Sequence, residues 1–514
     1  MQIPRAGSGS LFFQQERFLH PEKEIATDHR TIYKKNHIVV GWPKGKKKIF
    51  QSLARPHTGC IVGVALGDEG KGRIIDNKIE ELLHTKGITG VTVARFQGGN
   101  NSGHTVEAKG IHLALHQIPC GVMYKRATGI MDRGMTINPV DLVDEIRLVE
   151  EVAGSLRGRL FLSQDAILNS DLDRAEELLN RMRQGKAGGG TGRGIGPSYA
   201  HHYDRLGFHI YDLVGEEWKK LLGDQYDRYA KEFLLYGLKL SDVLVPDFLQ
   251  TKQLKKECKR TIGSKEEFVE RIARARKELL QRNIVTNTFL IHKRIVEKKS
   301  EAVLFEGAQA LGLHPWLGTL PDITASDTST YGIQTGTGFW KMAEIEERIG
   351  IFKIPYTSSV GARHMPTQAD DAWAHRVREE AHEYGTTTGR PRDILFPDLP
   401  MLTYNIRMSG VEILIGTHLD ISWEDLSIKV CTHYTDKKGT VVPYQPGLMY
   451  LTNVIPQYVT LLGWDGALVR KAKSFKQLPE NAKKFLAFLQ LRLATPIVAV
   501  TTGPSRENYL TIPS

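Results

Sequence analysis

One loop, residues 67–73 with the sequence GDEGKGR, constrains the fold of this chain more than any other stretch. It follows the apolar run 60–66 and precedes the helically periodic stretch 74–83, which together predict a buried strand, a tight loop and a helix. Glycines let the backbone approach a ligand closely, and the free N–H groups of a helix N-terminus attract anions. Lys71 adds a positive charge, so we predict that the loop binds phosphate.

This loop differs from the Walker A motif of ordinary P-loop NTPases at both ends. Ala65 stands where the motif has its first Gly, and Gly72 stands where it has the Ser or Thr that binds magnesium. An acidic residue in an anion-binding loop is costly unless it holds a metal ion or moves a proton. Asp68 is therefore the best single candidate for catalysis, and the simpler alternative is an Asp that caps the following helix.

Short β-branched runs alternate with helical segments from Cys60 onward. This alternation predicts an α/β fold with a P-loop-like, largely parallel central sheet flanked by helices, with helical and loop insertions. We expect a helical segment packed on the sheet at 215–300, and strands at 91–96, 159–162, 302–305, 350–354, 411–415 and 497–500. Ligands of such sheets bind at the carboxyl ends of the strands, so the loops there should converge on one site.

The basic charge is concentrated at the N-terminus. Of the net charge of +11, +7 lies in residues 1–57, which contain 11 Lys and Arg against 4 Asp and Glu. We interpret 1–56 as a flexible extension, most simply a solvated tail without a function of its own. Residues 57–514 are interpreted as one catalytic domain. Nucleic-acid binding through the extension is a weaker alternative, and acidic residues within it argue against a transit peptide.

The remaining composition indicates a cytoplasmic enzyme. No apolar stretch reaches the roughly 18 residues that a membrane-spanning helix needs, so no membrane association is expected. The four Cys residues are scattered without metal-ligand spacing, which fits a reducing compartment and offers neither a zinc site nor a disulfide framework.

Two further Gly-rich loops carry reactive side chains. The first, 97–106 with the sequence QGGNNSGHTV, presents His104 as a proton donor or charge stabiliser, although a lone His in such a turn is usually only a turn residue. The second, 188–197 with the sequence GGGTGRGIGP, contains one hydroxyl and one guanidinium group, and alone it would be a mobile linker.

The three loops together resemble, in order and spacing, those of the adenylosuccinate synthetase family. Further matches are FEGAQ at 305–309, DITAS at 322–326, YGTTTGR at 384–390, THLD at 417–420 and TTGP at 501–504, so the resemblance runs from about residue 59 to the C-terminus. It implies a ligase of purine biosynthesis, in the branch that leads to AMP. Such a ligase joins IMP and L-aspartate through a 6-phosphoryl-IMP intermediate, with GTP as co-substrate and Mg²⁺ as cofactor.

The resemblance also implies roles for single residues. Asp68 takes the proton from N1 of IMP and binds magnesium together with the carbonyl oxygen of Gly103, while His104 stabilises charge on the phosphates. The implied IMP contacts are Asn101, Thr191, Gln309, Thr324 and Arg390, with Arg205 contributed by the second subunit of a homodimer. The implied L-aspartate contacts are Arg193, Thr386, Thr387, Thr388 and Arg392. The implied GTP contacts are Gly67, Glu69, Gly70, Lys71, Gly72, Gly103, His104, Thr105, His418, Asp420, Thr501, Thr502, Gly503 and Pro504.

The chain departs from the family pattern at three positions. His418 stands where the guanine motif Thr-Lys-x-Asp has Lys, although the base-reading Asp420 is retained. Asp393 and Ser359 each stand where the family usually has Arg. These departures bear on nucleotide choice and rate more than on the class of reaction.

Two alternatives remain, the first a close enzyme relative and the second a protein of a different class. A related viral-type synthetase joins aspartate to a guanine nucleotide, and Asp68 argues against it because that branch alters this position. A non-catalytic GTP-binding relative needs neither Asp68 nor His104, and the chain has both.

Overall fold

The computed structural model describes residues 57–108, 111–184, 190–249, 251, 258–298, 300–359, 363–369, 371–384 and 391–513. The predicted N-terminal extension, 1–56, lies outside the described residues, so its role stays a prediction. Among the described residues, no helix has the length and apolarity that crossing a membrane requires.

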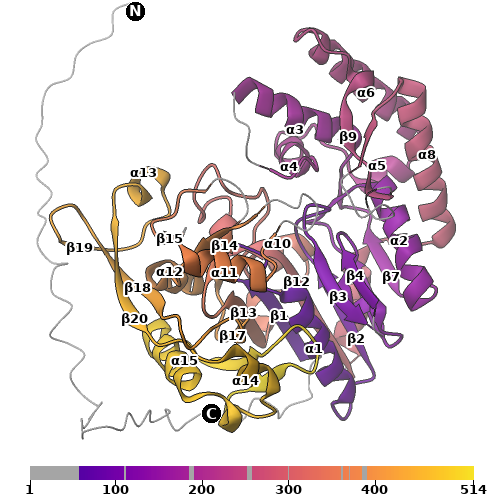
Figure 1. The fold of residues 1–514 in the computed structure, drawn as a ribbon. Helices are drawn as coiled ribbons and strands as arrows, with labels where there is room; N and C mark the ends of the chain where they lie inside the picture. Colours follow the sequence, from indigo (N-terminus) through magenta and orange to yellow (C-terminus); the bar gives the residue numbers. More distant parts are fainter. Residues whose placement is uncertain are drawn as a thin grey trace, which may run out of the picture. The chain divides into compact units, whose positions relative to one another are not determined.

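Ten strands of the described chain form the central sheet, in the order β11-β7-β5-β2-β12-β1-β13-β17-β21-β22. Figure 1 labels β1, β2, β7, β12, β13 and β17 of this sheet. Every neighbouring pair is parallel except the edge pair β21–β22, which confirms the predicted fold class. The strands are β1 (His57–Gly63), β2 (Gly90–Arg95), β5 (Ala127–Met131), β7 (Leu160–Ser163), β11 (Val285–Thr286), β12 (Glu301–Ala310), β13 (Glu347–Lys353), β17 (Ile413–Thr417), β21 (Ile497–Thr501) and β22 (Tyr509–Thr511).

All six strands predicted after the first loop are present in this sheet, within a few residues of their expected bounds. The sequence did not reveal β5, which lies between β2 and β7. Its sequence, ATGIM, contains Ala and Gly, which are uncommon in strands, so its position in the sheet comes from tertiary packing.

Hydrophobic side chains cover both faces of the sheet, because successive residues of a strand point to opposite sides. On β1, Ile61 belongs to a core cluster with Ile75 and Ile79 of α1 (Lys71–His84). Its neighbour Val62 belongs to a second cluster, which includes Leu402 of α12 (Leu399–Ser409). The two-sided burial explains the apolar run 60–62 within β1.

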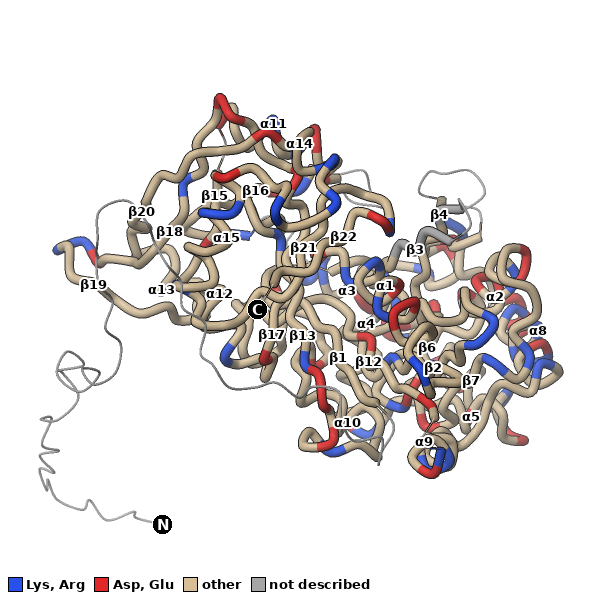
Figure 2. The backbone as a smooth tube through the Cα atoms, turned by 90° about the horizontal axis from the view of Figure 1, so that it is seen from below, with Lys and Arg blue, Asp and Glu red and all other residues tan. Residues whose placement is uncertain are grey.

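The predicted helical segment at 215–300 is confirmed, and it packs on other helices as well as on the sheet. Helix α8 (Lys265–Arg282) begins with a capping box between Ser264 and Glu267, and it packs against α2 (Pro139–Ala153) and α6 (Trp218–Leu234). Figures 1 and 2 both show α8 beside α2. Helix α9 (Thr288–Glu297) contacts strand β7 of the sheet.

The remaining α-helices and strands of the described residues lie outside the central sheet. The helices are α3 (Asp171–Gln184), α4 (Ile195–Tyr203), α5 (Ile210–Val214), α10 (Gly332–Thr337), α11 (Ala372–Glu380), α13 (Leu448–Leu451), α14 (Gly466–Lys471) and α15 (Glu480–Leu493). The strands are β3 (His104–Ala108), β4 (Ile111–Leu115), β6 (Thr136–Ile137), β8 (Ile167–Leu168), β9 (Leu244–Pro246), β10 (Lys259–Thr261), β14 (Thr357–Ser359), β15 (Gln368–Ala369), β16 (Asp393–Leu395), β18 (Ile428–Thr435), β19 (Val441–Val442) and β20 (Ile455–Leu461).

Candidate active site

The loop between β1 and α1 has an unusual backbone. Gly67, Asp68 and Gly70 all have positive φ, at 101°, 57° and 84°, and such a conformation is uncommon for a residue with a side chain such as Asp68. Gly70 is the N-cap of α1, and no side chain caps the helix. The alternative that Asp68 caps α1 is therefore wrong, and the first N–H groups of the helix remain suited to an anion.

Glu69 shapes the loop from inside. Its side chain is buried, and Oε1 accepts hydrogen bonds from the backbone N–H groups of Gly67 at 2.8 Å and Ala65 at 3.3 Å. The ammonium group of Lys71 donates to Oε2 at 2.8 Å, so the buried carboxylate is paired as well as hydrogen-bonded. Both residues are predicted GTP contacts, and in this structure they bind each other.

Asp68 and Arg392 lie together in the structure. The carboxylate of Asp68 pairs with Nη2 of Arg392 at 3.0 Å, and Nη1 of Arg392 pairs with Glu383 at 2.7 Å. Glu383 is buried, and it also accepts hydrogen bonds from Lys353 and, at 2.5 Å, from the hydroxyl of Tyr356. Burial favours the neutral acid, but the charge of Lys353 holds the pKa of Glu383 well below its usual range.

His104, at the start of β3, is oriented by a buried carboxylate. Its Nδ1 contacts Oε1 of Glu306 on β12, and Oε2 of Glu306 accepts from the backbone N–H of Cys120 at 2.9 Å. Burial lowers the pKa of His104, although the carboxylate acts in the opposite direction. Because Nδ1 is engaged, Nε2 is the ring nitrogen that can reach a ligand.

Three predicted IMP contacts have buried polar atoms without a hydrogen-bond partner in the described structure: Asn101 Oδ1, Gln309 Oε1 and Nε2, and Thr324 Oγ1. An unsatisfied buried polar group costs about 1–3 kcal/mol, so such groups mark a site that a ligand completes. Gln309 also has a positive φ of 57°, which is uncommon for such a side chain.

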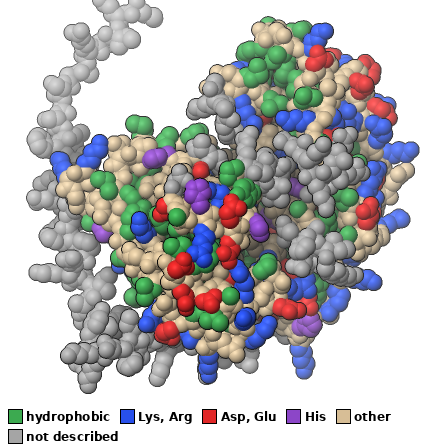
Figure 3. All heavy atoms as spheres, viewed as in Figure 1, with side chains coloured by type: hydrophobic (Ala, Val, Ile, Leu, Met, Phe, Trp, Pro, Cys, Tyr) green, Lys and Arg blue, Asp and Glu red, His purple; other side chains and the backbone are tan. Residues whose placement is uncertain are grey.

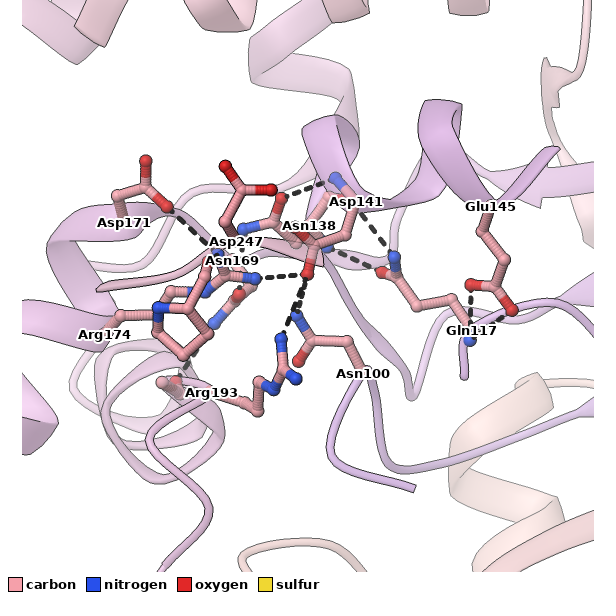
Figure 4. A network of polar contacts seen from close by, with 12 residues as sticks. Asn100, Gln117, Asn138, Asp141, Glu145, Asn169, Asp171, Arg174, Arg193 and Asp247 are labelled. Carbon is pink, nitrogen blue, oxygen red and sulfur yellow. Dashed lines mark hydrogen bonds and ion pairs between the residues drawn. The ribbon is translucent and has the colours of Figure 1, made fainter. Parts of the chain in front are cut away.

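The third loop is tied to α3 and to the second loop. Both carboxylate oxygens of Glu177 accept backbone hydrogen bonds, from Gly192 at 2.9 Å and Gly194 at 2.7 Å. Arg193 between them is buried, and its Nη1 lies 3.9 Å from Oδ2 of Asp141. Asn100 donates to the same oxygen at 3.0 Å, and Figure 4 shows both side chains directed toward Asp141. Thr191 is exposed at the edge of this network.

The predicted guanine residues meet at the ends of β17 and β21. His418 has a positive φ of 61°, and its backbone N–H donates to the hydroxyl of Thr501 at 3.1 Å. Desolvation and the charge of Lys353 lower the pKa of His418 to about 3, so its ring is neutral. The hydroxyl of Thr502 is buried without a hydrogen-bond partner in the described structure. Arg73 of α1 donates to the backbone oxygen of Gly503, which ties the 501–504 segment to the first loop.

For the other predicted contact residues the structure gives less information. Thr386, Thr387, Thr388 and Arg390 lie outside the described residues. Thr105 belongs to β3 beside His104, and Pro504 is exposed. Arg205 is exposed just after α4 and has a positive φ of 67°.

Comparison with known proteins decides the family. A family model described as adenylosuccinate synthetase matches residues 60–510. The chain belongs to the adenylosuccinate synthetase family. Adenylosuccinate synthetase of Acetivibrio thermocellus is 33% identical over 456 residues, which cover 88% of this chain and 99% of the relative. The enzyme of Halothermothrix orenii is 31% identical over 451 residues, covering 88% and 97%.

Solved structures show the same fold. Fully ligated adenylosuccinate synthetase from Plasmodium falciparum matches with a TM-score of 0.78 and 28% identity, over 89% of this chain and 100% of that chain. Succinoaminodeoxyadenylate synthetase of cyanophage S-2L, bound to dGMP and to dATP as an energy donor, matches with a TM-score of 0.53 and 15% identity, over 89% and 96%. The second match is a likeness of fold alone.

The adenylosuccinate synthetase motifs named only part of this site. Sequence reasoning gave no role to Glu306, although a charged residue within the apolar run AVLFEG of β12 is a signal of function. The same signal was present in Lys353, the buried Lys that ends the strand sequence ERIGIFK. Glu177 and Glu383 lie in ordinary polar surroundings in the sequence, and only the three-dimensional contacts identify them.

Proposed function

We propose that this chain joins IMP and L-aspartate to form adenylosuccinate, while GTP is converted to GDP and phosphate. The observation that supports the proposal most strongly is the set of unpartnered buried atoms on Asn101, Gln309 and Thr324. Asn101 is far in the sequence from Gln309 and Thr324, and the resemblance assigns all three to one nucleotide. A polar ligand that satisfies them would remove the cost of burying them.

In the first step Asp68 accepts the N1 proton of IMP, and the electron pair moves to O6. O6 attacks the γ-phosphorus of GTP, the bond to the β-phosphate oxygen breaks, and GDP leaves. Nε2 of His104, oriented by Glu306, donates to the phosphate oxygens as charge develops there. Glu306 favours the protonated imidazole that this role needs and acts against burial, which lowers the pKa of His104; the polyanion would add to the effect of Glu306.

In the second step the amine of L-aspartate attacks C6 and loses a proton to solvent, and phosphate leaves with the former O6. Arg392 and Arg193 are proposed to hold the aspartate carboxylates, since guanidinium groups bind carboxylates through two parallel hydrogen bonds. Glu383 fixes Arg392 from one side, and the site of attack then lies next to the base, Asp68. Thr386, Thr387 and Thr388 are proposed to complete this part of the site.

The donor atoms suit a magnesium ion. Mg²⁺ prefers oxygen ligands, and the proposed ligands are the half-exposed carboxylate of Asp68 and the carbonyl oxygen of the exposed Gly103. When bound, the ion neutralises charge on the transferred phosphoryl group. A Cβ at Gly103 would meet nothing closer than His116 at 3.8 Å, so this backbone is open to a ligand.

We also propose a homodimer in which Arg205 reaches the IMP site of the other subunit. Arg205 is exposed, and it is flanked by the exposed side chains of Tyr203 and Leu206, at 76% and 57%. Exposed apolar residues around an Arg are typical of a protein–protein contact. The four Cys residues are free, which supports a reducing compartment such as the cytoplasm.

The test is an assay of adenylosuccinate formation by purified protein, with IMP, L-aspartate, GTP and Mg²⁺ omitted one at a time. We expect product only when all four are present. Product from dGMP and L-aspartate, with none from IMP, would instead assign the chain to the activity of the viral-type relatives.

A further inference from the structure

The carboxylate of Asp420 has a partner that the family motifs did not indicate. Asp420 follows β17, its side chain is only 7% exposed, and its Oδ2 accepts a hydrogen bond from Nε of Arg470 at 2.9 Å. Arg470 lies on α14, 50 residues further along the chain. The pairing therefore links the base-reading loop to a helix outside every motif that we recognised in the sequence.

Arg470 is itself held in place. Its Nη2 donates to Oε1 of Glu380 at the end of α11, at 2.8 Å. The other oxygen of Glu380 accepts from the indole N–H of Trp423 at 2.9 Å. Figure 3 shows acidic and basic side chains close together on the face of the molecule that carries α11. Because both ends of the guanidinium group are engaged, Arg470 has a defined orientation toward Asp420.

The backbone of Asp420 is fixed against the same helix. Gly466 opens α14, and a Cβ at this position would lie 2.0 Å from the carbonyl oxygen of Asp420, so only Gly allows the contact. The indole N–H of the buried Trp464 donates to the carbonyl oxygen of Leu419 at 2.8 Å. The segment around Asp420 and the start of α14 therefore behave as one packed unit.

The geometry of a carboxylate lets it bind Arg470 and guanine together. An ionised carboxylate has about four acceptor positions, two on each oxygen. Arg470 occupies one of those on Oδ2, whereas the N1–H and N2–H groups of guanine need one on each oxygen. A hydrogen bond from a guanidinium group also fixes the plane of the carboxylate.

We infer that Arg470 is a positioning residue for nucleotide selectivity, which holds Asp420 in the orientation that guanine requires. The inference rests on the proposed function, because that proposal makes Asp420 the residue that reads the base. Adenine offers no N–H pair at this edge, so it gains nothing from the same arrangement. Loss of Arg470 should consequently weaken the binding of guanine nucleotides and leave that of adenine nucleotides unchanged.

The experiment measures the equilibrium binding of GDP and of ADP by calorimetry, with the full-length protein and Mg²⁺. In Arg470→Ala we expect the Kd for GDP to rise about tenfold, the effect of losing one charge-assisted contact, and the Kd for ADP to stay the same. The KM for GTP should rise in parallel, while the KM values for IMP and L-aspartate do not change. Glu380→Gln, which frees Arg470 without touching Asp420, should give a smaller rise for GDP.

Arg376→Ala is the matched control. Arg376 belongs to α11 on the same face, pairs with Asp425 at 3.0 Å and lies over the ring of Trp423 at 4.3 Å. This variant should bind GDP as the wild type does. If wild-type protein prefers GDP to ADP and Arg470→Ala binds GDP as tightly or more tightly, the role of Arg470 is wrong and the assignment of Asp420 stands. Wild-type protein that does not prefer GDP to ADP overturns the role of Arg470 together with the assignment of Asp420.

Discussion

The guanidinium group of Arg392 forms an ion pair with the carboxylate of Asp68, with Nη2 3.0 Å from Oδ2. Asp68 follows β1, and Arg392 immediately precedes β16, in a distant part of the sequence. The contact brings the proposed proton acceptor for IMP next to the proposed carboxylate-binding group for L-aspartate. Both substrates of the condensation can therefore meet at one point.

Asp68→Asn keeps the shape of the side chain and removes the base. Turnover should fall by about 10²–10⁴-fold, the usual contribution of a general base, whereas IMP binding should change little. Adenylosuccinate formation and calorimetric binding of IMP measure the two effects separately. Asp425→Asn, which alters an exposed ion pair with Arg376, is the control. Activity within a few-fold of the wild type would remove Asp68 from the role of base.

Glu383→Gln should raise the KM for L-aspartate about tenfold, because Arg392 loses the buried carboxylate that orients it. The KM for IMP should stay within about twofold, a split that general loss of structure does not produce. Glu379→Gln is the matched control, because Glu379 accepts a hydrogen bond from the hydroxyl of Tyr384 and, in the described part of the chain, does not pair with Arg392. Equal effects on both KM values would contradict a specific role in binding aspartate.

The same carboxylate contributes a pH-dependent part of the free energy of unfolding. The pKa of Glu383 is lower in the folded protein than the ordinary value of 4.5, so its contribution is present above that pH and is lost as the pH falls further. In Glu383→Gln, stability measured by urea unfolding should fall less steeply below pH 4.5 than in the wild type. Parallel curves for the two proteins would exclude this contribution.

Glu306→Gln should shift the pH dependence of kcat. The ionised Glu306 raises the pKa of His104 against the effect of burial, so its loss should move the alkaline limb of the profile to lower pH. His104→Asn should remove that limb and depress kcat strongly. Cys120→Ser, which retains a donor toward Glu306, should leave the limb in place. An unmoved limb in Glu306→Gln would mean that the carboxylate does not tune His104.

If Arg205 reaches the IMP site of the other subunit, each active site is shared between two subunits. Mixing inactive Arg205→Leu protein with inactive Asp68→Asn protein should restore part of the activity, because a hybrid dimer contains one site with both residues intact. Each variant mixed with itself is the control. A fully active enzyme that sediments as a monomer would rule out the contribution from a second subunit.

Local patterns in the sequence correctly predicted the structural features that depend on residues close together in the chain. The apolar run, the glycines and the periodic stretch after them correctly predicted β1, the loop and α1, because strand burial, positive φ and helical packing each leave a local signature. Resemblance then named Asn101, Gln309 and Thr324, whose unpartnered atoms the structure shows.

Contacts between distant segments could not be predicted in this way. The pairs Asp420–Arg470 and Arg392–Glu383 depend on how separate loops meet, and a single sequence carries no signal for that. Ser359 and Asp393, two departures from the family pattern, are direct partners across the antiparallel pair β14–β16. The two changes therefore alter one place in the site, although the sequence presents them as independent.

Transfer of the γ-phosphoryl group of GTP to O6 of IMP can be tested most directly by following the oxygen at C6. IMP labelled with ¹⁸O at position 6 should yield adenylosuccinate without the label and inorganic phosphate that contains it, because O6 leaves with the phosphoryl group. The phosphate is analysed by mass spectrometry after turnover with GTP and L-aspartate. Phosphate without the label, or GTP hydrolysis without adenylosuccinate, would contradict phosphoryl transfer to O6.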